Sequence, residues 1–188
     1  MIISISGAQG SGKSTLAKSL AKKLKWPRYY MGGLRRAAAK KHGLTLAEFN
    51  KLGETNPETD SFVDDYQKEL GQTQDNFVIE GRTSWHFIPH SLKIYIDVDA
   101  KVGAMRIFND LQENAKDRNE DTNLLSFEDV LASSKRRFKS DNKRYQQYYG
   151  INVYDPKNYD LCLDSTKMGK YEVLQAVYDF VMHNIDKK

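Results

Sequence analysis

The fold of this chain is decided by the stretch Gly7-Ala8-Gln9-Gly10-Ser11-Gly12-Lys13-Ser14-Thr15. It follows the apolar run at residues 1–6 and precedes a segment in which Leu16, Leu20 and Leu24 share one helical face. A strand, a glycine-rich turn and a helix therefore succeed one another, which is the order that a P-loop requires. The turn also matches the pattern G-x-x-x-x-G-K-[ST] at Gly7, Gly12, Lys13 and Ser14.

This predicted loop assigns chemistry to individual residues. Its glycines let successive backbone N–H groups converge on phosphate oxygens, and the following helix adds the positive end of its dipole. Lys13 is expected to reach the β and γ phosphates of ATP, and Ser14 to offer its hydroxyl to Mg²⁺. The loop residues predicted to bind the nucleotide are Gly7, Gly10, Ser11, Gly12, Lys13, Ser14 and Thr15.

The composition limits the size of the fold and the kind of partner. A chain of 188 residues suits one compact domain spanning residues 1–188. The net charge of +4, from 29 basic and 25 acidic residues, fits acidic small molecules better than nucleic acid. Because the only cysteine, Cys162, lies in an apolar stretch, we expect a buried thiol, no disulfide and a reducing compartment. No apolar stretch approaches the length of a membrane span, so we expect a cytoplasmic protein without a membrane partner.

Short apolar runs predict four further strands, at residues 28–31, 77–80, 93–98 and 161–164. Helical periodicity lies between them, most clearly at residues 14–24 and 171–185. Strands that alternate with helices indicate an α/β fold. We therefore predict a P-loop three-layer α/β/α architecture with a mostly parallel five-stranded sheet.

Two polar segments are too long to be simple connections between strands. Residues 33–73 carry many charges and predict an inserted substrate-binding segment made of short helices. Residues 110–124 hold few apolar residues and predict a lid, in which Arg118, with Lys116 as second choice, is expected to close over the γ phosphate. Inserted segments at the carboxyl edge of a parallel sheet are where substrate binding and closure are expected.

Several arginines are placed where a second phosphate could bind. Arg82 follows the strand at residues 77–80, so it emerges beside the P-loop, and Arg36 opens the first inserted segment. Converging guanidinium groups hold a dianion through paired hydrogen bonds. The spacing i, i+4 and i+7 places three more charged residues on one helical face: Arg137, Asp141 and Arg144. That face is compatible either with a ligand site or with solvated salt bridges.

A P-loop does not by itself separate nucleotide hydrolysis from phosphoryl transfer. GTPases read guanine with an [N/T]-K-x-D tetrapeptide, but the candidate sequences at residues 142–145 and 166–169 both lack the aspartate. The signature segment of a transporter ATPase is also missing from the sequence. The classes that remain are kinases for small acceptors, a nucleotide-binding regulator without turnover, and a nucleic-acid end kinase. Acidic residues between positions 54 and 65 disfavour the last of these, because a long acceptor needs a basic track.

Beside the P-loop, the distinctive stretches are Gly32-Gly33-Leu34-Arg35-Arg36-Ala37-Ala38-Ala39-Lys40-Lys41-His42-Gly43-Leu44-Thr45-Leu46-Ala47-Glu48-Phe49-Asn50, Glu80-Gly81-Arg82 and Lys143-Arg144-Tyr145-Gln146-Gln147-Tyr148-Tyr149-Gly150. Leu163-Asp164-Ser165-Thr166, followed by a helix, closes the pattern. Over nearly its whole length the chain resembles cytidylate kinase, in the short archaeal-type branch of the nucleoside monophosphate kinase family. The P-loop is shared with many kinases, so the other stretches carry most of this resemblance.

The resemblance implies roles for the arginines. Arg36, Arg82 and Arg144 would hold the phosphate of the acceptor nucleotide. Arg137 and Asp141 would contact its ribose, which favours a ligand site over a solvated helix face.

The activity that the resemblance implies is transfer of the γ phosphate of ATP to CMP or dCMP with Mg²⁺. We expect the protein to be a monomer. Ser14 would bind the metal, and Glu80 would either hold a metal-bound water or orient Arg82. Arg106 would stack on adenine or touch a phosphate of ATP. The residues expected to act in the transfer are Lys13, Arg82, Arg118 and Arg137. Another phosphorylated acceptor and a non-catalytic regulator stay open as alternatives.

Base recognition is where this chain departs from the bacterial branch of the family. There, an aspartate that helps to read cytosine follows the Gly-Arg pair, whereas Thr83 follows Arg82 here. The resemblance therefore leaves the base preference of the acceptor open.

Overall fold

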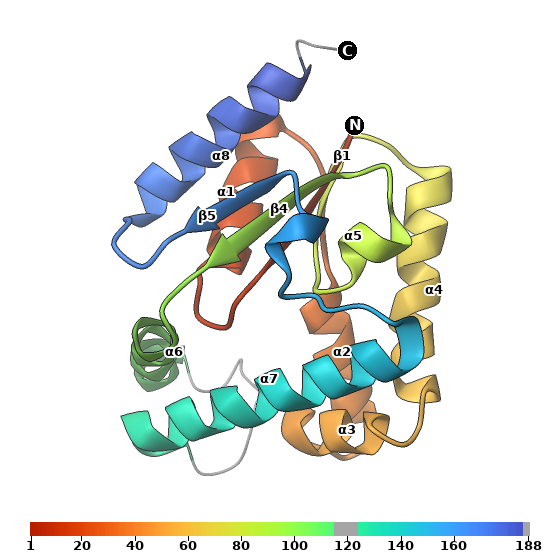
Figure 1. Cartoon of the computed structure of the whole chain (residues 1–188), viewed down its shortest axis with the longest axis vertical. Helices are drawn as coiled ribbons and strands as arrows, with labels where there is room; N and C mark the ends of the chain where they lie inside the picture. The colour runs from red at the N-terminus through yellow and green to blue at the C-terminus, as the bar shows by residue number, and fades with distance from the viewer. Residues whose placement is uncertain (115–123, 186–188) are drawn as a thin grey trace.

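The computed structural model describes residues 1–114 and 124–185, which are built around one sheet of five parallel strands (Figure 1). The strands lie in the order β2-β3-β1-β4-β5. Their bounds are Ile2–Gly7 for β1, Arg28–Tyr30 for β2, Phe77–Glu80 for β3, Leu92–Asp97 for β4 and Leu161–Asp164 for β5. The connections lead first to one side of β1 and then to the other, so the carboxyl end of β1 is the point where a ligand is expected to bind.

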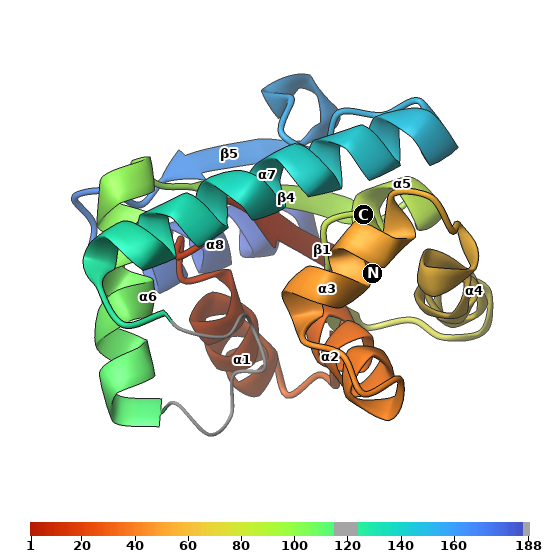
Figure 2. The same ribbon diagram turned by 90° about the horizontal axis from the view of Figure 1, so that it is seen from below.

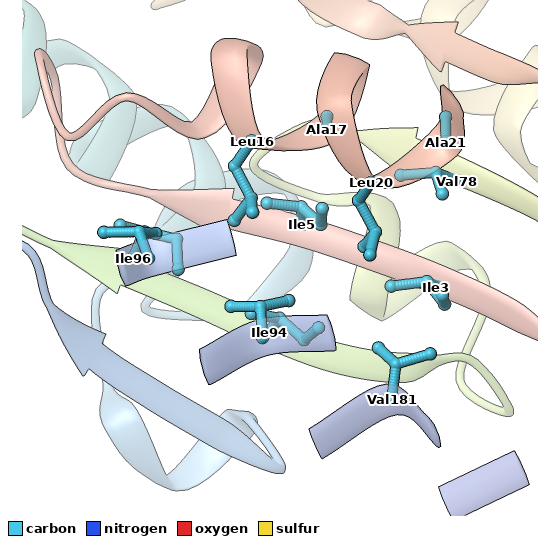
Figure 3. Close-up of a cluster of buried hydrophobic side chains, with 12 residues drawn as sticks. Ile3, Ile5, Leu16, Ala17, Leu20, Ala21, Val78, Ile94, Ile96 and Val181 are labelled. Atoms are coloured by element: carbon cyan, nitrogen blue, oxygen red, sulfur yellow. The ribbon is translucent and has the colours of Figure 1, made fainter. Parts of the chain in front are cut away.

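Helices α1 (Lys13–Leu24) and α8 (Lys170–Ile185) cover one face of this sheet (Figure 1). Every residue of β1 is buried, including Ser4 and Ser6 between and after its isoleucines, as expected of a parallel strand that is covered on both faces. Ile3 and Ile5 lie in one cluster with Leu16 and Leu20 of α1 and with Val181 of α8 (Figure 3). These side chains are almost fully removed from water. Such burial stabilises the fold by about 25 cal/mol for each Å² of apolar surface.

The other face is covered by helices from the inserted segment and by a short helix after β3. Their bounds are Met31–Lys41 for α2, Leu46–Gly53 for α3, Glu58–Thr73 for α4 and Ser84–Phe87 for α5. Met31 and Val63 pack on Phe77 and Ile79, whose side chains point away from α1. Thr45 begins α3 with a capping box, because its side chain accepts from the backbone of Glu48 while Glu48 accepts in return.

Helix α7 (Phe127–Tyr149) joins the two sides of the molecule. It packs against α6 (Ala100–Asn114) and against α3, and Figure 2 shows it running from α6 across to the side of α3. A capping box between Ser126 and Asp129 begins the helix, and Gly150, with a φ of 68°, ends it. The charged face of α7 is thereby held close to the carboxyl edge of the sheet.

The structure confirms the α/β architecture and the five-stranded parallel sheet. The strands predicted at residues 77–80 and 161–164 have those bounds, and β4 is shifted by one residue from the prediction. Strand β2 ends before Met31 because α2 begins there. Helix α6 continues to Asn114, so it includes the first part of the predicted lid, whereas residues 115–123 lie outside the described residues.

The prediction of a buried thiol at Cys162 is wrong, because this side chain is exposed. Strand β5 is an edge strand, and only Leu161 and Leu163 point toward the apolar cluster beneath α8. Cys162 faces the opposite side, as alternate residues of a strand do. Within residues 1–114 and 124–185, no helix is both long and apolar enough to cross a membrane.

Candidate active site

The P-loop connects β1 to α1 and has the backbone conformation that its glycines predict. Gly10 and Gly12 have φ values of 74° and 84°, in the left-handed region that favours glycine. A Cβ on Gly10 would lie 2.1 Å from the carbonyl oxygen of Gly103 in α6, so no larger residue fits there. Lys13 begins α1, and its ammonium group donates to the carbonyl oxygen of Ala8 at 3.2 Å.

Ser14 and Glu80 meet beside this loop. The hydroxyl of Ser14 donates to Oε1 of Glu80 at 2.6 Å, and Glu80 is 1% exposed at the end of β3. Arg28 of β2 donates to the other carboxylate oxygen, from Nε at 2.9 Å and from Nη2 at 2.6 Å. Glu80 is therefore oriented by Arg28, and it is not the partner of Arg82. Arg28 was missed by sequence reasoning because nothing in its local sequence indicates a partner on β3.

A hydroxyl and a carboxylate are the oxygen donors that Mg²⁺ prefers. No group of three or more histidine, cysteine, aspartate and glutamate side chains that could hold a metal occurs in the described part of the chain. Ser14 and Glu80 would therefore supply only part of a coordination shell. Such a site suits an ion that keeps several waters and binds phosphate oxygens, as Mg²⁺ does in phosphoryl-transfer sites.

A cavity of about 450 Å³ separates the P-loop from the inserted segment. One wall consists of Lys13, Ser14 and Thr15, together with Glu80 at the end of β3. The facing residues come from α2, α4, α7 and the turn after β3, and the charged ones among them are Arg35, Arg36, Asp60, Asp64, Arg82 and Arg137. The cavity can therefore hold two phosphate groups, one on each side.

Three of the predicted acceptor-site arginines line this cavity: Arg36, Arg82 and Arg137. Arg36 donates to the carbonyl oxygen of Gly32 at 3.2 Å and to the hydroxyl of Tyr30. The Nε atom of Arg82 lies 3.0 Å from Oδ2 of Asp141. Burial opposes the positive charge of Arg82, but Asp141, Tyr154 and Tyr145 together outweigh it and raise the pKa of this guanidinium.

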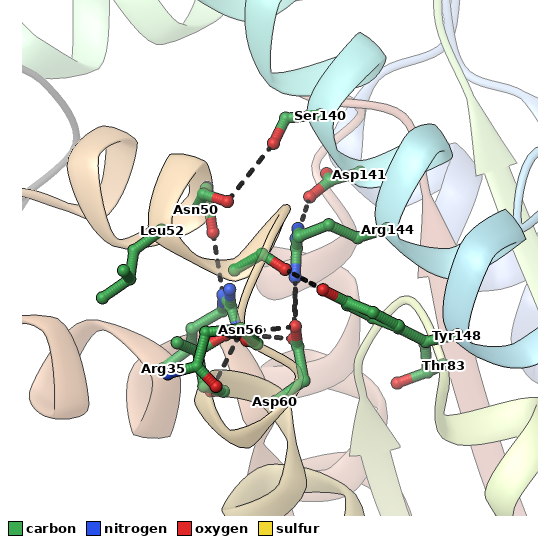
Figure 4. Close-up of polar contacts among 12 residues, drawn as sticks. Arg35, Asn50, Leu52, Asn56, Asp60, Thr83, Ser140, Asp141, Arg144 and Tyr148 are labelled. Atoms are coloured by element: carbon green, nitrogen blue, oxygen red, sulfur yellow. Dashed lines mark hydrogen bonds and ion pairs between the residues drawn. The ribbon is translucent and has the colours of Figure 1, made fainter.

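Asp141 and Arg144 are buried and are not among the residues that line the cavity. Their side chains meet each other on α7 (Figure 4). The side chain of Arg144 is 0% exposed and donates to Asp60 at 2.7 and 2.6 Å and to Asp141 at 2.6 Å. Burial disfavours the charge of Asp141, yet the guanidinium groups of Arg82 and Arg144 outweigh it and lower the pKa of the carboxyl. This burial excludes a solvated salt-bridged face for the two residues.

Arg35, which sequence reasoning did not single out, also lines the cavity. Its guanidinium donates to Oδ1 of Asn50 at 2.8 Å, to the carbonyl of Thr59 at 3.2 Å and to Asp60. Asp60 therefore joins Arg35 of α2 to Arg144 of α7 (Figure 4). We call the chain Arg35–Asp60–Arg144–Asp141–Arg82 the buried charge network. The adjacent Arg35 and Arg36 point differently because successive helix residues lie about 100° apart.

On the other side of the P-loop, Arg106 of α6 contacts the loop after β5. It donates to the carbonyl oxygen of Ser165 at 2.8 Å and to its hydroxyl at 3.2 Å. Ser165 donates in turn to the carbonyl oxygen of Ser11 at 3.1 Å, which joins this loop to the P-loop. Arg106 is thus joined to the P-loop through Ser165, and it is not among the residues that line the cavity. Arg118 and Lys116 lie outside the described residues.

A phosphate-binding loop, oxygen ligands for a divalent cation and guanidinium groups on the facing wall define a phosphotransferase of the P-loop class. Residues 2–167 match the cytidylate kinase-like family. The chain is 35% identical to cytidylate kinase from Methanosarcina acetivorans over 94% of each protein. It is 33% identical to that of Pyrococcus abyssi, over 98% of this chain and 97% of the other. The chain belongs to the cytidylate kinase-like family.

Solved structures support the fold alone. A shikimate kinase from Bacteroides thetaiotaomicron superposes with a TM-score of 0.63 at 14% identity, over 97% of this chain and 98% of the other. An uncharacterised protein from Eubacterium ventriosum superposes with a TM-score of 0.68 at 18% identity, over 100% of this chain and 99% of the other. At such low identity, neither structure bears on the acceptor.

Proposed function

We propose that the protein is a cytidylate kinase, which transfers the γ-phosphoryl group of ATP to CMP or dCMP. The observation that carries this proposal is one cavity with a P-loop on one wall and Arg36, Arg82 and Arg137 on the other. A protein that only sensed ATP would not need the second set of cations. The acceptor that matches them already carries a phosphate dianion, since guanidinium groups bind its oxygens in pairs.

The proposed reaction needs position and charge more than covalent chemistry from the protein. An oxygen of the acceptor phosphate forms a bond to the γ phosphorus, while the bond from that phosphorus to the β–γ bridging oxygen breaks. ADP leaves with the electron pair of the broken bond. Lys13 is proposed to neutralise charge on the β and γ phosphates, and Arg82 and Arg137 to hold the acceptor phosphate in line with them.

Ser14 and Glu80 are proposed to hold Mg²⁺, Ser14 directly and Glu80 through water. When bound, the ion would neutralise charge on the β and γ phosphates. The chain itself contributes a carboxylate whose orientation is fixed before the ion binds, because Ser14 donates to one oxygen of Glu80 and Arg28 donates to the other.

Asp141 and Arg144 are proposed to act through Arg82 and not by contact with the acceptor. Both side chains are buried, and Asp141 lies 3.0 Å from the guanidinium of Arg82. Arg36 and Arg137 are proposed to contact the acceptor directly, with Arg137 nearest the ribose. Arg35 is added to this set because it lines the same cavity.

The remaining roles follow the family resemblance. Arg106, held by the loop after β5, is proposed to contact the adenine of ATP. Arg118 is proposed to act from the lid. We also propose that the protein works as a monomer in the cytoplasm on small nucleotides, without a nucleic-acid partner.

A coupled assay of ADP release tests the proposal, with ATP and one of CMP, dCMP, UMP, AMP or GMP as acceptor. We expect CMP and dCMP to give the highest rates. Arg82→Ala should reduce the CMP-dependent rate about tenfold or more while ATP binding, titrated alone, changes little. Arg136→Ala is the control, because it removes an arginine that is exposed and lies next to Arg137 on α7. Equal ADP release with and without any acceptor would contradict the proposal.

A further inference from the structure

At the acceptor end of the cavity, two polar side chains lie among the lining residues without belonging to the phosphate-binding set. Asp64 comes from α4 and Thr83 from the turn after β3. They are 7% and 6% exposed, so what remains accessible of them faces the cavity. We propose that Asp64 and Thr83 read the base of the acceptor nucleotide and favour cytosine over uracil. This inference rests on the proposed function.

Two buried hydrogen bonds leave the hydroxyl of Thr83 free to act as a donor. Ser84 donates its hydroxyl to Oε1 of Gln67 at 2.6 Å, which fixes the orientation of the Gln67 amide. The amide nitrogen of Gln67 then donates to Oγ1 of Thr83 at 3.3 Å. Since Thr83 accepts this bond, its own hydrogen points elsewhere, and no residue of the described chain accepts it. Thr83 therefore offers a donor to the cavity.

Asp64 is set as an acceptor in a similar way. The hydroxyl of Tyr149 donates to Oδ2, no residue of the described chain donates to Oδ1, and Asp64 lines the cavity. Oδ1 is therefore the oxygen assigned to the ligand. Burial, which removes solvent from the carboxyl, and the nearby charge of Asp60 raise the pKa of Asp64 to about 7, although Tyr149, Lys68 and Arg35 act in the opposite direction. A carboxylate in this place is costly until a ligand donates to it, because buried charge needs a partner. A donor from the ligand would supply that partner.

A donor beside an acceptor matches one edge of cytosine. Its ring nitrogen N3 accepts a hydrogen bond, and the amino group on C4 donates one. Thr83 would donate to N3, and Asp64 would accept from the amino group. In uracil the corresponding groups are an N–H and a carbonyl, so donor would face donor and acceptor would face acceptor. Adenine presents the same pair as cytosine, so these residues separate amino bases from keto bases, and the size of the pocket must exclude purines.

Substituting each residue tests the inference through the ratio of kcat/KM for CMP to that for UMP. Asp64→Asn should lower this ratio about tenfold, because an amide can turn either its oxygen or its nitrogen toward the base. Thr83→Val should lower the ratio by a similar factor, because kcat/KM for CMP falls when the donor is lost. Thr83→Ser keeps the hydroxyl and should keep the ratio. Asp65→Asn is the matched control, since Asp65 is the exposed neighbour of Asp64 on α4.

Titration of CMP and of UMP without ATP provides a second readout that does not depend on turnover. The same loss of preference should appear in the binding constants. Wild-type protein that phosphorylates CMP, with an unchanged ratio in Asp64→Asn and in Thr83→Val, would overturn this inference and leave the proposed function intact. Wild-type protein that phosphorylates neither CMP nor UMP would instead overturn the proposed function. If Thr83→Val does not fold, Asp64→Asn and Thr83→Ser still decide the question.

Discussion

The two sides of the cavity are built from different interactions. On the P-loop side, β1, α1 and α8 enclose an apolar cluster that includes Ile3, Ile5 and Leu20. On the acceptor side, α2, α4 and α7 are joined by the buried charge network, whose members include Asp60 and Arg144. Apolar contacts tolerate small shifts, but a buried ion pair is stable only with both partners in place. The comparison indicates that apolar packing holds both sides and that the acceptor side adds charge pairing to it.

The largest effect is expected from cutting this network at Arg144. Arg144→Leu should lower the free energy of unfolding by about 3 to 5 kcal/mol, because it leaves the carboxylates of Asp60 and Asp141 buried with less positive charge. Urea unfolding followed by circular dichroism measures this loss. Lys143→Leu removes an exposed cation beside it and should cost less than about 1 kcal/mol. Equal losses in both variants would mean that the network does not stabilise the acceptor side.

Lys13→Ala addresses the P-loop side and should leave stability nearly unchanged. The rate of phosphoryl transfer should fall about 100-fold or more, since a preorganised charge at the phosphates is lost. Steady-state kcat with saturating ATP and CMP provides the measurement, and Lys18→Ala, an exposed lysine on α1, provides the control. Near-normal kcat in Lys13→Ala would exclude this lysine from the mechanism.

Asp64 should make the acceptor side sensitive to pH. Its pKa of about 7 in the folded protein lies above the 3.8 of the ordinary carboxyl, so the folded state binds more protons between these values. Stability contributed by the protonated group is therefore lost as pH rises toward 7. Relative to wild type, Asp64→Asn should gain on the order of 2 to 3 kcal/mol between pH 5 and pH 8. Thermal unfolding at both pH values measures this difference, and a constant difference would rule out the raised pKa.

Asp141→Asn should have the smallest effect, and this effect should fall on the KM for CMP and not on the KM for ATP. Arg82 would lose its charged partner at 3.0 Å, so the KM for CMP should rise about tenfold while the KM for ATP stays unchanged. Assays at a temperature where the variant is folded keep stability out of the comparison. An equal rise in both KM values would show that Asp141 supports the fold in general and does not position Arg82.

Sequence reasoning succeeded where the signal is local. The P-loop is contiguous, and its glycines specify the backbone of residues 7–12 directly. Strands such as β3 are short apolar runs with clear limits, so their bounds were predicted closely. Arg36, Arg82 and Arg137 were expected at the site because they follow strands or share a helical face, and the structure brings them to one cavity.

What could not be predicted depends on contacts between distant segments. The partners of Asp60 lie on α2 and α7, and the periodicity of α4 does not predict them. Arg28 meets Glu80 only because β2 pairs with β3 in one register. The exposure of Cys162 follows from the place of β5 at the edge of the sheet. The apolar sequence around Cys162 does not indicate that its strand is an edge strand.

The close approach of Gly10 to Gly103 has a mechanical consequence. Two backbones meet there without side chains, and such a contact has no rotamers through which a displacement could be absorbed. A shift of the P-loop toward α6 would therefore meet the backbone of the helix directly. Arg106 stands one turn beyond Gly103 on that helix, so such a shift would also bear on its guanidinium. The P-loop and the helix that carries Arg106 are thus in contact through the backbones of Gly10 and Gly103.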